Sequence, residues 1–284
     1  MRRKKVLIRG AGDLASGIAL RLHHSGFAVA MTEIPVPTTV RRTVAFSPAV
    51  YLGSAWVEDV AGVLCQDVEE LEGQVAAGRI PVLVDEQAGI CQTWKPQVVV
   101  DAILAKRNTG TRITDAGTVI GVGPGFMAGV DCHCVVETRR GHSLGRCIWE
   151  GGAIPDTGIP GMIGGYGMER LLRAPAEGVF QGAVKIGERV EAGQVVGYVD
   201  CREAEPVPVA ARIRGVVRGL LQDGVVVTEG MKAGDVDPRC QRDHCFTVSD
   251  KARAIGGGVL EAILDHEERK KRSRSGTGTI SRGS

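Results

Sequence analysis

The sequence has few aromatic residues and no surplus of charge of either sign. Phe, Trp and Tyr make up 4% of its 284 residues, and 35 basic against 33 acidic residues leave a formal net charge of +2. Nucleic-acid binding favours a basic surplus. A transmembrane helix needs about 18 consecutive apolar residues, and no such run is present. We therefore expect neither nucleic acid nor a membrane as a partner.

Cysteine, at eight residues, is too dilute for a disulfide-stapled fold. The triplet Cys132-His133-Cys134 comes nearest to a metal motif. On a strand its cysteines would face one side and its histidine the other, so only two of the three could reach one ion. We predict no metal site. Arg9 and Asp13 interrupt the apolar stretch after the basic N-terminus, so we expect no secretory signal and a cytoplasmic protein with reduced thiols.

Glycine, in contrast, is abundant, at 40 of 284 residues. The glycines follow no three-residue period and 43% of the chain is hydrophobic, which excludes collagen and global disorder. The excess must therefore be local, at tight turns, left-handed positions or places where the backbone approaches a ligand.

The first glycine-rich turn follows an apolar run at residues 6–8. Gly10, Gly12 and Ala15 fit a G-x-G-x-x-A pattern, and the residues from Leu14 onward have helical periodicity. In dinucleotide-binding proteins the first glycine permits the turn, the second admits a pyrophosphate, and the small residue allows close packing. The amides at the helix N-terminus would then hold the phosphates.

Glu33 lies 21 residues after Gly12, at the expected end of the second strand, where it could accept a hydrogen bond from a ribose hydroxyl. Asp13 would repel a pyrophosphate unless it caps the helix or binds a metal or ribose. A turn of this type that binds nothing is the alternative interpretation.

Further strands are predicted at 27–31, 56–60, 81–84, 97–100 and 118–122, with a helix at 67–77. We interpret them as a Rossmann-like parallel sheet, whose carboxyl edge would gather Asp85, Asp101 and a second glycine turn with Gly123 and Gly125. Helix capping is the alternative role for the two aspartates.

Residues 141–167 contain nine glycines, and we predict a binding loop there. His133 and Glu137 would share one strand face just before it, which makes them candidate catalytic residues. Cys245 is a third candidate, because nearby positive charge lowers a thiol pKa, although the residue type favours a buried structural cysteine. The residues that we expect to contact a substrate or ligand are His142, Arg146, Asp156, Thr157, Lys251 and Arg253.

An internal duplication occupies residues 174–237. A shift of 37 residues aligns ten identical residues within 174–200, five of them glycines. The repeat resembles the biotinyl/lipoyl carrier fold, a small all-β barrel-sandwich. The hairpin between its halves, residues 201–206, has no lysine that could be modified, so we expect neither biotin nor lipoate.

After the duplication, two helical pieces are predicted around Gly256, Gly257 and Gly258, whose backbone we expect to pack closely on another element. The predicted organisation is a nucleotide-binding domain at 1–130, a glycine-rich site segment at 131–172, the sandwich module at 173–238, a helical segment at 239–265 and a disordered tail at 266–284.

The combined motifs resemble the YqeB-type accessory proteins of the selenium-dependent molybdenum hydroxylase system. The matching stretches are residues 9–17, 121–126, 141–146, 155–161 and 249–258. The resemblance implies a role in maturing molybdenum hydroxylases, with a hydroxylase or a selenium-delivery protein as partner.

On this reading the protein would bind a molybdopterin dinucleotide or similar ligand and assist insertion of selenium or cofactor, with Cys245 handling the selenium. Two alternatives are an NAD-dependent oxidoreductase and a non-enzymatic scaffold that docks a partner through the sandwich module. The sequence is compatible with an enzyme and with a non-enzymatic protein, and a second copy of the chain, in a homo-oligomer, is a further candidate partner.

Overall fold

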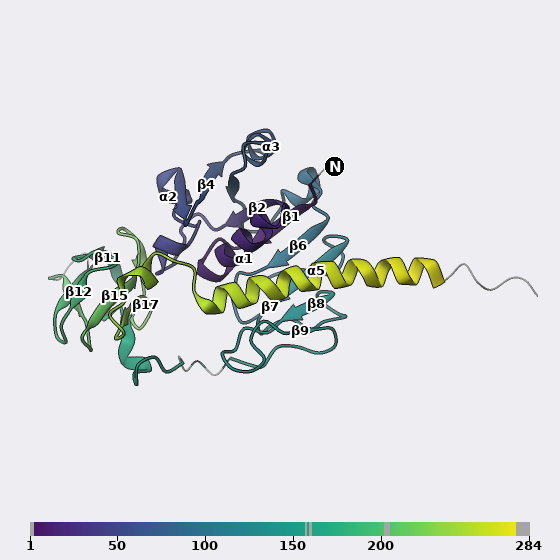
Figure 1. The fold of residues 1–284 in the computed structure, drawn as a ribbon. Helices are drawn as coiled ribbons and strands as arrows, with labels where there is room; N and C mark the ends of the chain where they lie inside the picture. Colours follow the sequence, from purple (N-terminus) through teal and green to yellow (C-terminus); the bar gives the residue numbers. More distant parts are fainter. Residues whose placement is uncertain (1–2, 157, 159–160, 202–204, 277–284) are drawn as a thin grey trace, which may run out of the picture.

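The computed structural model describes residues 3–156, 158, 161–201 and 205–276. Within them, a large sheet with helices on both faces forms the main body, and two small sheets form a second lobe (Figure 1). The longest helix, α5 (Asp250–Gly276), leaves the small lobe and runs along the main body (Figure 1).

The large sheet has nine described strands in the order β3-β4-β5-β2-β1-β6-β7-β8-β9. The strands β4, β5, β2, β1, β6, β7 and β8 are parallel, whereas β3 and β9 pair antiparallel at the two edges. Their bounds are β1 (Lys5–Arg9), β2 (Ala28–Glu33), β3 (Ser54–Val57), β4 (Val60–Cys65), β5 (Ile80–Val84), β6 (Val98–Asp101), β7 (Thr118–Val122), β8 (Cys134–Val136) and β9 (Cys147–Ile148).

Alternate residues of the central strands pack on opposite faces of this sheet. Ile8 faces a core shared with α1 (Asp13–His24) and α5, and its neighbour Leu7 faces a core shared with α3 (Val68–Ala76) and α4 (Cys91–Trp94). The strands are buried on both sides, which explains their continuous apolar runs. Two short elements complete the main body, the 3-10 turn η1 (Arg42–Val44) and the helix α2 (Ala49–Leu52).

The small lobe consists of two four-stranded antiparallel sheets, in the orders β10-β17-β15-β12 and β14-β13-β11-β16. The strands are β10 (Leu171–Arg173), β11 (Gly178–Gly182), β12 (Arg189–Val190), β13 (Val195–Asp200), β14 (Val207–Ala210), β15 (Gly215–Leu220), β16 (Val226–Val227) and β17 (Lys232–Asp237). Each sheet takes one short strand from the other half of the repeat, because β12 pairs with β15 and β16 pairs with β11. The 3-10 turns η2 (Met168–Arg170) and η3 (Arg242–Cys245) flank the lobe.

The expected fold class, a Rossmann-like parallel sheet with a biotinyl/lipoyl-like barrel-sandwich, is wrong. The large sheet is mixed, because Glu58 adopts a left-handed conformation (φ 53°) and turns the expected strand at 56–60 into the hairpin β3–β4. In the small lobe, no pairing among the described residues joins the two sheets, so they do not close into a barrel. The structure is a mixed α/β fold with one large sheet.

The predicted break in α5 at its three glycines is also absent, and the helix is continuous from Asp250 to Gly276. It continues beyond residue 265, where we expected disorder, because its last turns contact the main body. The His266 ring stacks on His133 at a centroid distance of 4.2 Å, and the Arg269 guanidinium lies 4.2 Å from the Trp149 ring centroid. Residues 277–284 lie outside the described part of the chain.

Glycine instead allows α5 to pack unusually closely on its neighbours. A Cβ on Gly17 of α1 would lie 2.7 Å from the Cβ of Ala252, and one on Gly256 would lie 3.1 Å from the Cβ of Arg21. A Cβ on Gly258 would overlap the carbonyl oxygen of Gly145. The expected close approach of this backbone to another element is therefore present.

We predict that Gly258→Ala destabilises the protein by about 1–3 kcal/mol, the usual cost of overpacking a close contact. Gly257→Ala is the matched control, because a Cβ there meets nothing within 4 Å. It should stabilise the helix by up to about 1 kcal/mol through its higher helix propensity. Urea unfolding followed by circular dichroism measures both changes, and equal effects at the two positions would contradict the packing argument.

Candidate functional site

Two adjoining cavities lie at the carboxyl edge of the parallel strands, where ligands bind in open α/β sheets. The first, of about 330 Å³, contains the glycine turn and is lined by Gly10, Gly12, Asp13, Ala15, Thr32, Glu33, Asp85, Glu86 and neighbouring residues. The second, of about 620 Å³, is lined by Lys106, Pro124, Thr138, Arg139, Arg140, Ile154, Asp156, Met162, Lys251 and neighbouring residues. We call them the glycine-turn chamber and the basic chamber. Leu14 and Leu104 line both.

The glycine turn places the N-terminus of α1 at the wall of the glycine-turn chamber. Gly10 is left-handed (φ 91°), and a Cβ there would lie 3.1 Å from the carbonyl oxygen of Ala102, so only glycine fits. Gly12 is the N-cap residue, and no side chain in the described part of the chain caps it. The amides of this first turn are therefore available to an anionic ligand.

Asp13 does not oppose such a ligand with a free charge. Its Oδ2 accepts a hydrogen bond from Nη1 of Arg41 at 2.9 Å, which forms an ion pair. Nη2 of Arg41 donates to the carbonyl oxygen of His244, also at 2.9 Å. Arg41 thus both neutralises Asp13 and joins the glycine turn to the segment that follows the small lobe.

The Glu33 carboxylate stands at the end of β2, as the sequence predicts, and supports the turn directly. It accepts hydrogen bonds from the backbone amides of Ala11 (2.9 Å) and Ile34 (2.8 Å). Burial raises its pKa, against the effect of these two amides. Because each carboxylate oxygen has two lone pairs, Glu33 can still accept a hydrogen bond from a ligand.

Asp101 and Asp85, in contrast, already have structural partners. Asp101 is buried and pairs with Arg9, with an Nη1 to Oδ2 distance of 3.2 Å, and accepts a 2.6 Å hydrogen bond from the hydroxyl of Thr111. Asp85 accepts hydrogen bonds from the amides of Gly89 and Ile90, just before α4. The capping alternative therefore fits Asp85.

The second glycine turn supports the loops around the cavities. A Cβ on Gly123 would lie 2.9 Å from Oγ1 of Thr138, and one on Gly125 would lie 2.6 Å from the Cα of Arg107. Of this turn, it is Pro124 that lines the basic chamber. Gly123 and Gly125 thus act by allowing the loops after β6, β7 and β8 to pack together.

Glu137 holds the glycine-rich loop in place. Its carboxylate is 2% exposed and accepts hydrogen bonds from the backbone amides of Thr138 and Arg139, both at 2.7 Å, and of Ile154 at 2.8 Å. This arrangement directs residues on both arms of the loop into the basic chamber.

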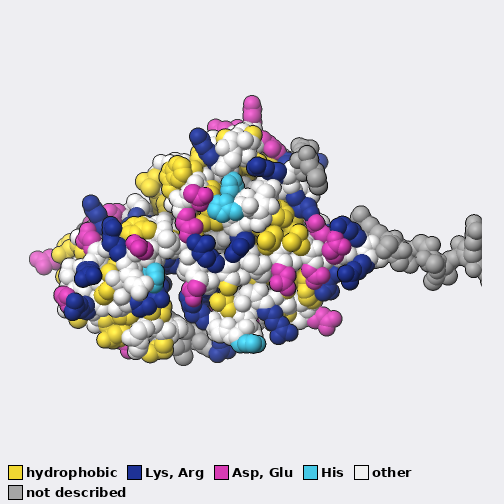
Figure 2. Space-filling view, in the orientation of Figure 1, with side chains coloured by type: hydrophobic (Ala, Val, Ile, Leu, Met, Phe, Trp, Pro, Cys, Tyr) yellow, Lys and Arg dark blue, Asp and Glu magenta, His cyan; other side chains and the backbone are white. Residues whose placement is uncertain are grey.

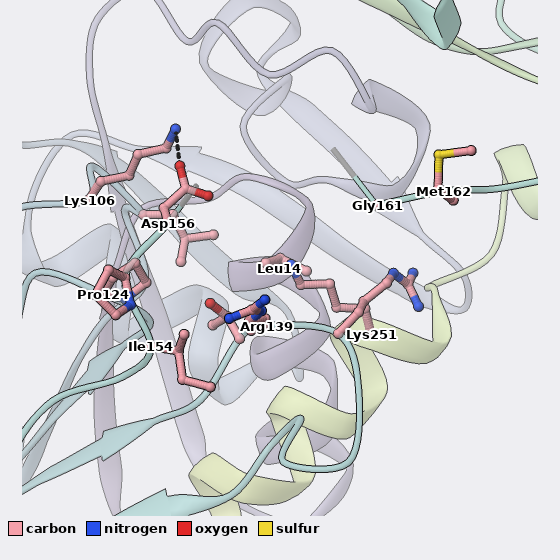
Figure 3. A pocket seen from close by; sticks show the side chains of 13 residues that line it. Leu14, Lys106, Pro124, Arg139, Ile154, Asp156, Gly161, Met162 and Lys251 are labelled. Atoms are coloured by element: carbon pink, nitrogen blue, oxygen red, sulfur yellow. Dashed lines mark ion pairs between the residues drawn. The ribbon is translucent and has the colours of Figure 1, made fainter. Parts of the chain in front are cut away.

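The basic chamber carries two ion pairs and two further cations. Lys106 pairs with Asp156 at 2.5 Å, and Arg140 with Asp250 at 2.6 Å. In Figure 3, Lys106 and Asp156 lie together, and Arg139 lies between this pair and Lys251. Burial and the charge of Arg140 lower the pKa of Lys251.

Of the residues expected to contact a ligand, Asp156 and Lys251 therefore line the same cavity, the basic chamber. His142 and Arg146 are exposed on the loop and do not line it. Arg253 pairs with Glu58 at 2.6 Å. Thr157 lies outside the described residues. The residues that the sequence reading missed, Thr138, Arg139 and Arg140, follow the end of β8, so the rule that ligands gather at strand carboxyl ends could have identified them.

The three candidate catalytic residues lie in separate places. His133 is at the amino end of β8, where its Nδ1 accepts a hydrogen bond from the Val119 amide, and Glu137 follows the carboxyl end. Cys245 is fully buried under the small lobe, with Sγ 3.7 Å from the carbonyl oxygen of Val217. Burial raises its pKa, which disfavours the thiolate that a nucleophile requires.

Within the described ranges, no three His, Cys, Asp or Glu side chains are grouped closely enough to hold a metal ion. No helix in those ranges combines the length and hydrophobicity needed to cross a bilayer. Figure 2 shows basic and acidic side chains interspersed over one face, with a hollow between the small lobe and the main body.

Comparison with known proteins gives one close relative. Over 259 residues the chain is 49% identical to the uncharacterized protein YqeB of Escherichia coli (strain K12). This chain is homologous to YqeB over that stretch. The match covers 91% of this chain and 47% of YqeB, so the chain spans about half the length of the curated relative that it matches. The expected resemblance to YqeB-type proteins is confirmed. No protein-family model matches the chain.

Solved structures match more weakly. A succinylglutamate desuccinylase/aspartoacylase from Rhodobacter sphaeroides matches 24% of this chain and 21% of its own, at 25% identity and a TM-score of 0.23. An aspartoacylase family protein from Mesorhizobium loti matches 83% and 85%, at 11% identity and a TM-score of 0.28. TM-scores this low do not establish a common fold.

We predict that the stacked histidines make folding stability sensitive to pH. Burial, reinforced by the charge of His133, lowers the pKa of His266 from 6.5 to about 4. Between those values the unfolded chain binds more protons than the folded one, so stability falls as pH drops through this window.

The variant His266→Gln should lose part of this pH dependence, which urea unfolding at about pH 7 and about pH 5 measures. His142→Gln, on the exposed loop, is the control and should retain the wild-type dependence. If His266→Gln loses as much stability on acidification as the wild type, the assignment to His266 is wrong.

Proposed function

We propose that the glycine-turn chamber binds a dinucleotide-type ligand, with molybdopterin dinucleotide as the first candidate and NAD as the second. The observation that carries the proposal is the N-terminus of α1, which opens without a side-chain cap into a cavity that Glu33 also lines, beside the glycine turn. A helix N-terminus and a carboxylate in this relation suit a pyrophosphate and a ribose hydroxyl respectively.

The charges around the chamber favour one orientation of such a ligand. Glu33, Asp85 and Glu86 line the glycine-turn chamber, so this part suits the hydroxyl and amino donors of a nucleoside. The basic chamber adjoins it at Leu14 and Leu104. Because unlike charges attract, phosphates would lie on the side of α1 that faces the basic chamber.

The biological role that we propose is that of a cytoplasmic accessory protein in the maturation of selenium-dependent molybdenum hydroxylases. It rests on the resemblance of the motifs to YqeB-type proteins and on the homology to YqeB. A hydroxylase or a selenium-delivery protein would be the partner. The burial and raised pKa of Cys245 do not favour a selenium-handling thiolate at that position, so the proposal assigns it no such step.

The proposal predicts micromolar or tighter binding of a molybdopterin dinucleotide, and at least tenfold weaker binding by Gly12→Ala. A Cβ at Gly12 would meet only Oγ1 of Thr39, at an ordinary 3.4 Å, so the fold tolerates the methyl group. The same methyl group would obstruct a pyrophosphate that approaches the backbone. Isothermal titration calorimetry measures both affinities.

Gly73→Ala is the matched control, because Gly73 lies in α3 and a Cβ there meets nothing within 4 Å. It should bind as the wild type does. Tight binding of NAD with no binding of any molybdopterin dinucleotide would overturn the proposed role and favour the oxidoreductase. If the wild type and Gly12→Ala bound molybdopterin dinucleotide with equal affinity, the glycine turn would not be part of the binding site.

A further inference from the structure

The basic chamber offers hydrogen-bond donors that nothing in the described structure uses. Lys251, in the first turn of α5, and Arg139, after β8, both line the chamber. Neither side chain has a hydrogen-bond or ion-pair partner among the described residues, whereas Lys106 and Arg140 are both paired with aspartates. Neither cation is therefore held in a direct ion pair, although the charges of Asp13, Asp156 and Glu137 act on Lys251.

A third donor is more deeply buried. Thr138 is 7% exposed and lines the chamber, and its hydroxyl makes no hydrogen bond within the described part of the chain. Its backbone amide is fixed by Glu137, and Gly123 packs against the hydroxyl side. The hydroxyl oxygen itself is not fully buried, so it can donate a hydrogen bond to a ligand acceptor in the chamber.

We propose that the basic chamber is a binding site for a phosphate monoester, held by Arg139, Lys251 and Thr138. The charge and the donor count select this class. A phosphate monoester carries close to two negative charges near neutral pH and presents three acceptor oxygens, which match one hydroxyl and two cations that have no direct ion-pair partner in the described structure. A carboxylate has one charge and two oxygens, so it would leave a cation unpaired.

The rest of the chamber indicates what the phosphate is attached to. At about 620 Å³ the cavity is much larger than a phosphate group. Its other walls are largely apolar and include Leu104 together with Leu14, Pro124, Ile154 and Met162, which Figure 3 labels. Apolar walls with a few converging polar groups are typical of sites for small organic ligands. The expected ligand is therefore an organic phosphate with an apolar or planar body.

This site does not depend on the proposed dinucleotide. The two chambers share only Leu14 and Leu104 among their lining residues, and the three phosphate-binding residues belong to the loop after β8 and to α5. Gly12→Ala should therefore leave phosphate-monoester binding unchanged. Loss of one kind of binding without the other would show which proposal fails.

Isothermal titration calorimetry of the full chain with phenyl phosphate, inorganic phosphate and benzoate tests the site. We expect phenyl phosphate to bind at least tenfold more tightly than either of the others, because only it supplies both the dianion and the apolar body. Arg139→Gln and Lys251→Gln should each weaken it at least tenfold. Arg146→Gln, which removes an exposed cation of the same loop, is the matched control and should bind as the wild type.

Each contrary result overturns a defined part of the proposal. Equal affinity for inorganic phosphate would assign the site to the free ion, and equal affinity for benzoate would reject the requirement for a dianion. If neither Arg139→Gln nor Lys251→Gln changed the affinity for phenyl phosphate, the ligand would bind elsewhere on the protein.

A measurement on the wild type avoids any folding defect of the variants. Phenyl phosphate should slow acetylation of Lys251 by acetic anhydride, as followed by mass spectrometry, without slowing that of the exposed Lys185. Equal acetylation of Lys251 with and without phenyl phosphate would overturn the proposal.

Discussion

The close contact between α1 and α5 is the constraint on which the site depends. Gly17 and Gly256 let the two helices meet almost backbone to backbone, and Gly258 does the same for the glycine-rich loop at Gly145. Because α5 comes from the far end of the sequence, this contact carries Lys251 to a cavity built mainly from the first two-thirds of the chain. Wider spacing would move the lysine away from the ends of β7 and β8.

Two carboxylates hold the loops at that edge in a fixed position relative to the sheet. Glu33 binds the amide of Ala11 at the first glycine turn, and Glu137 binds three amides of the loop after β8. Both carboxylates accept hydrogen bonds from backbone amides. These bonds fix loops that have few apolar side chains available for packing. Acidic residues surround Glu33, whereas cations surround Glu137. This difference divides a continuous sheet edge into two chemically different chambers.

The sequence predicted most of the central strands and the two glycine turns, since apolar runs and glycine spacing are local signals. It could not show the antiparallel edges, because the direction of β3 and β9 depends on single turns such as that at Glu58. Asp101 and Glu137 fell at the expected edge, but their buried partners Arg9 and the loop amides were invisible. Arg139 carries only one sequence signal, its place just after the carboxyl end of β8, and only the fold shows that it lines a cavity.

The exchange of short strands in the small lobe has a consequence for how the duplicated segment can fold. β12 finds its partner β15, and β16 its partner β11, across the middle of the repeat. Neither half contains a complete sheet, so a chain released only as far as Asp200 would leave β12 unpaired. The lobe therefore reaches its complete strand pairing only after both copies of the repeat are available.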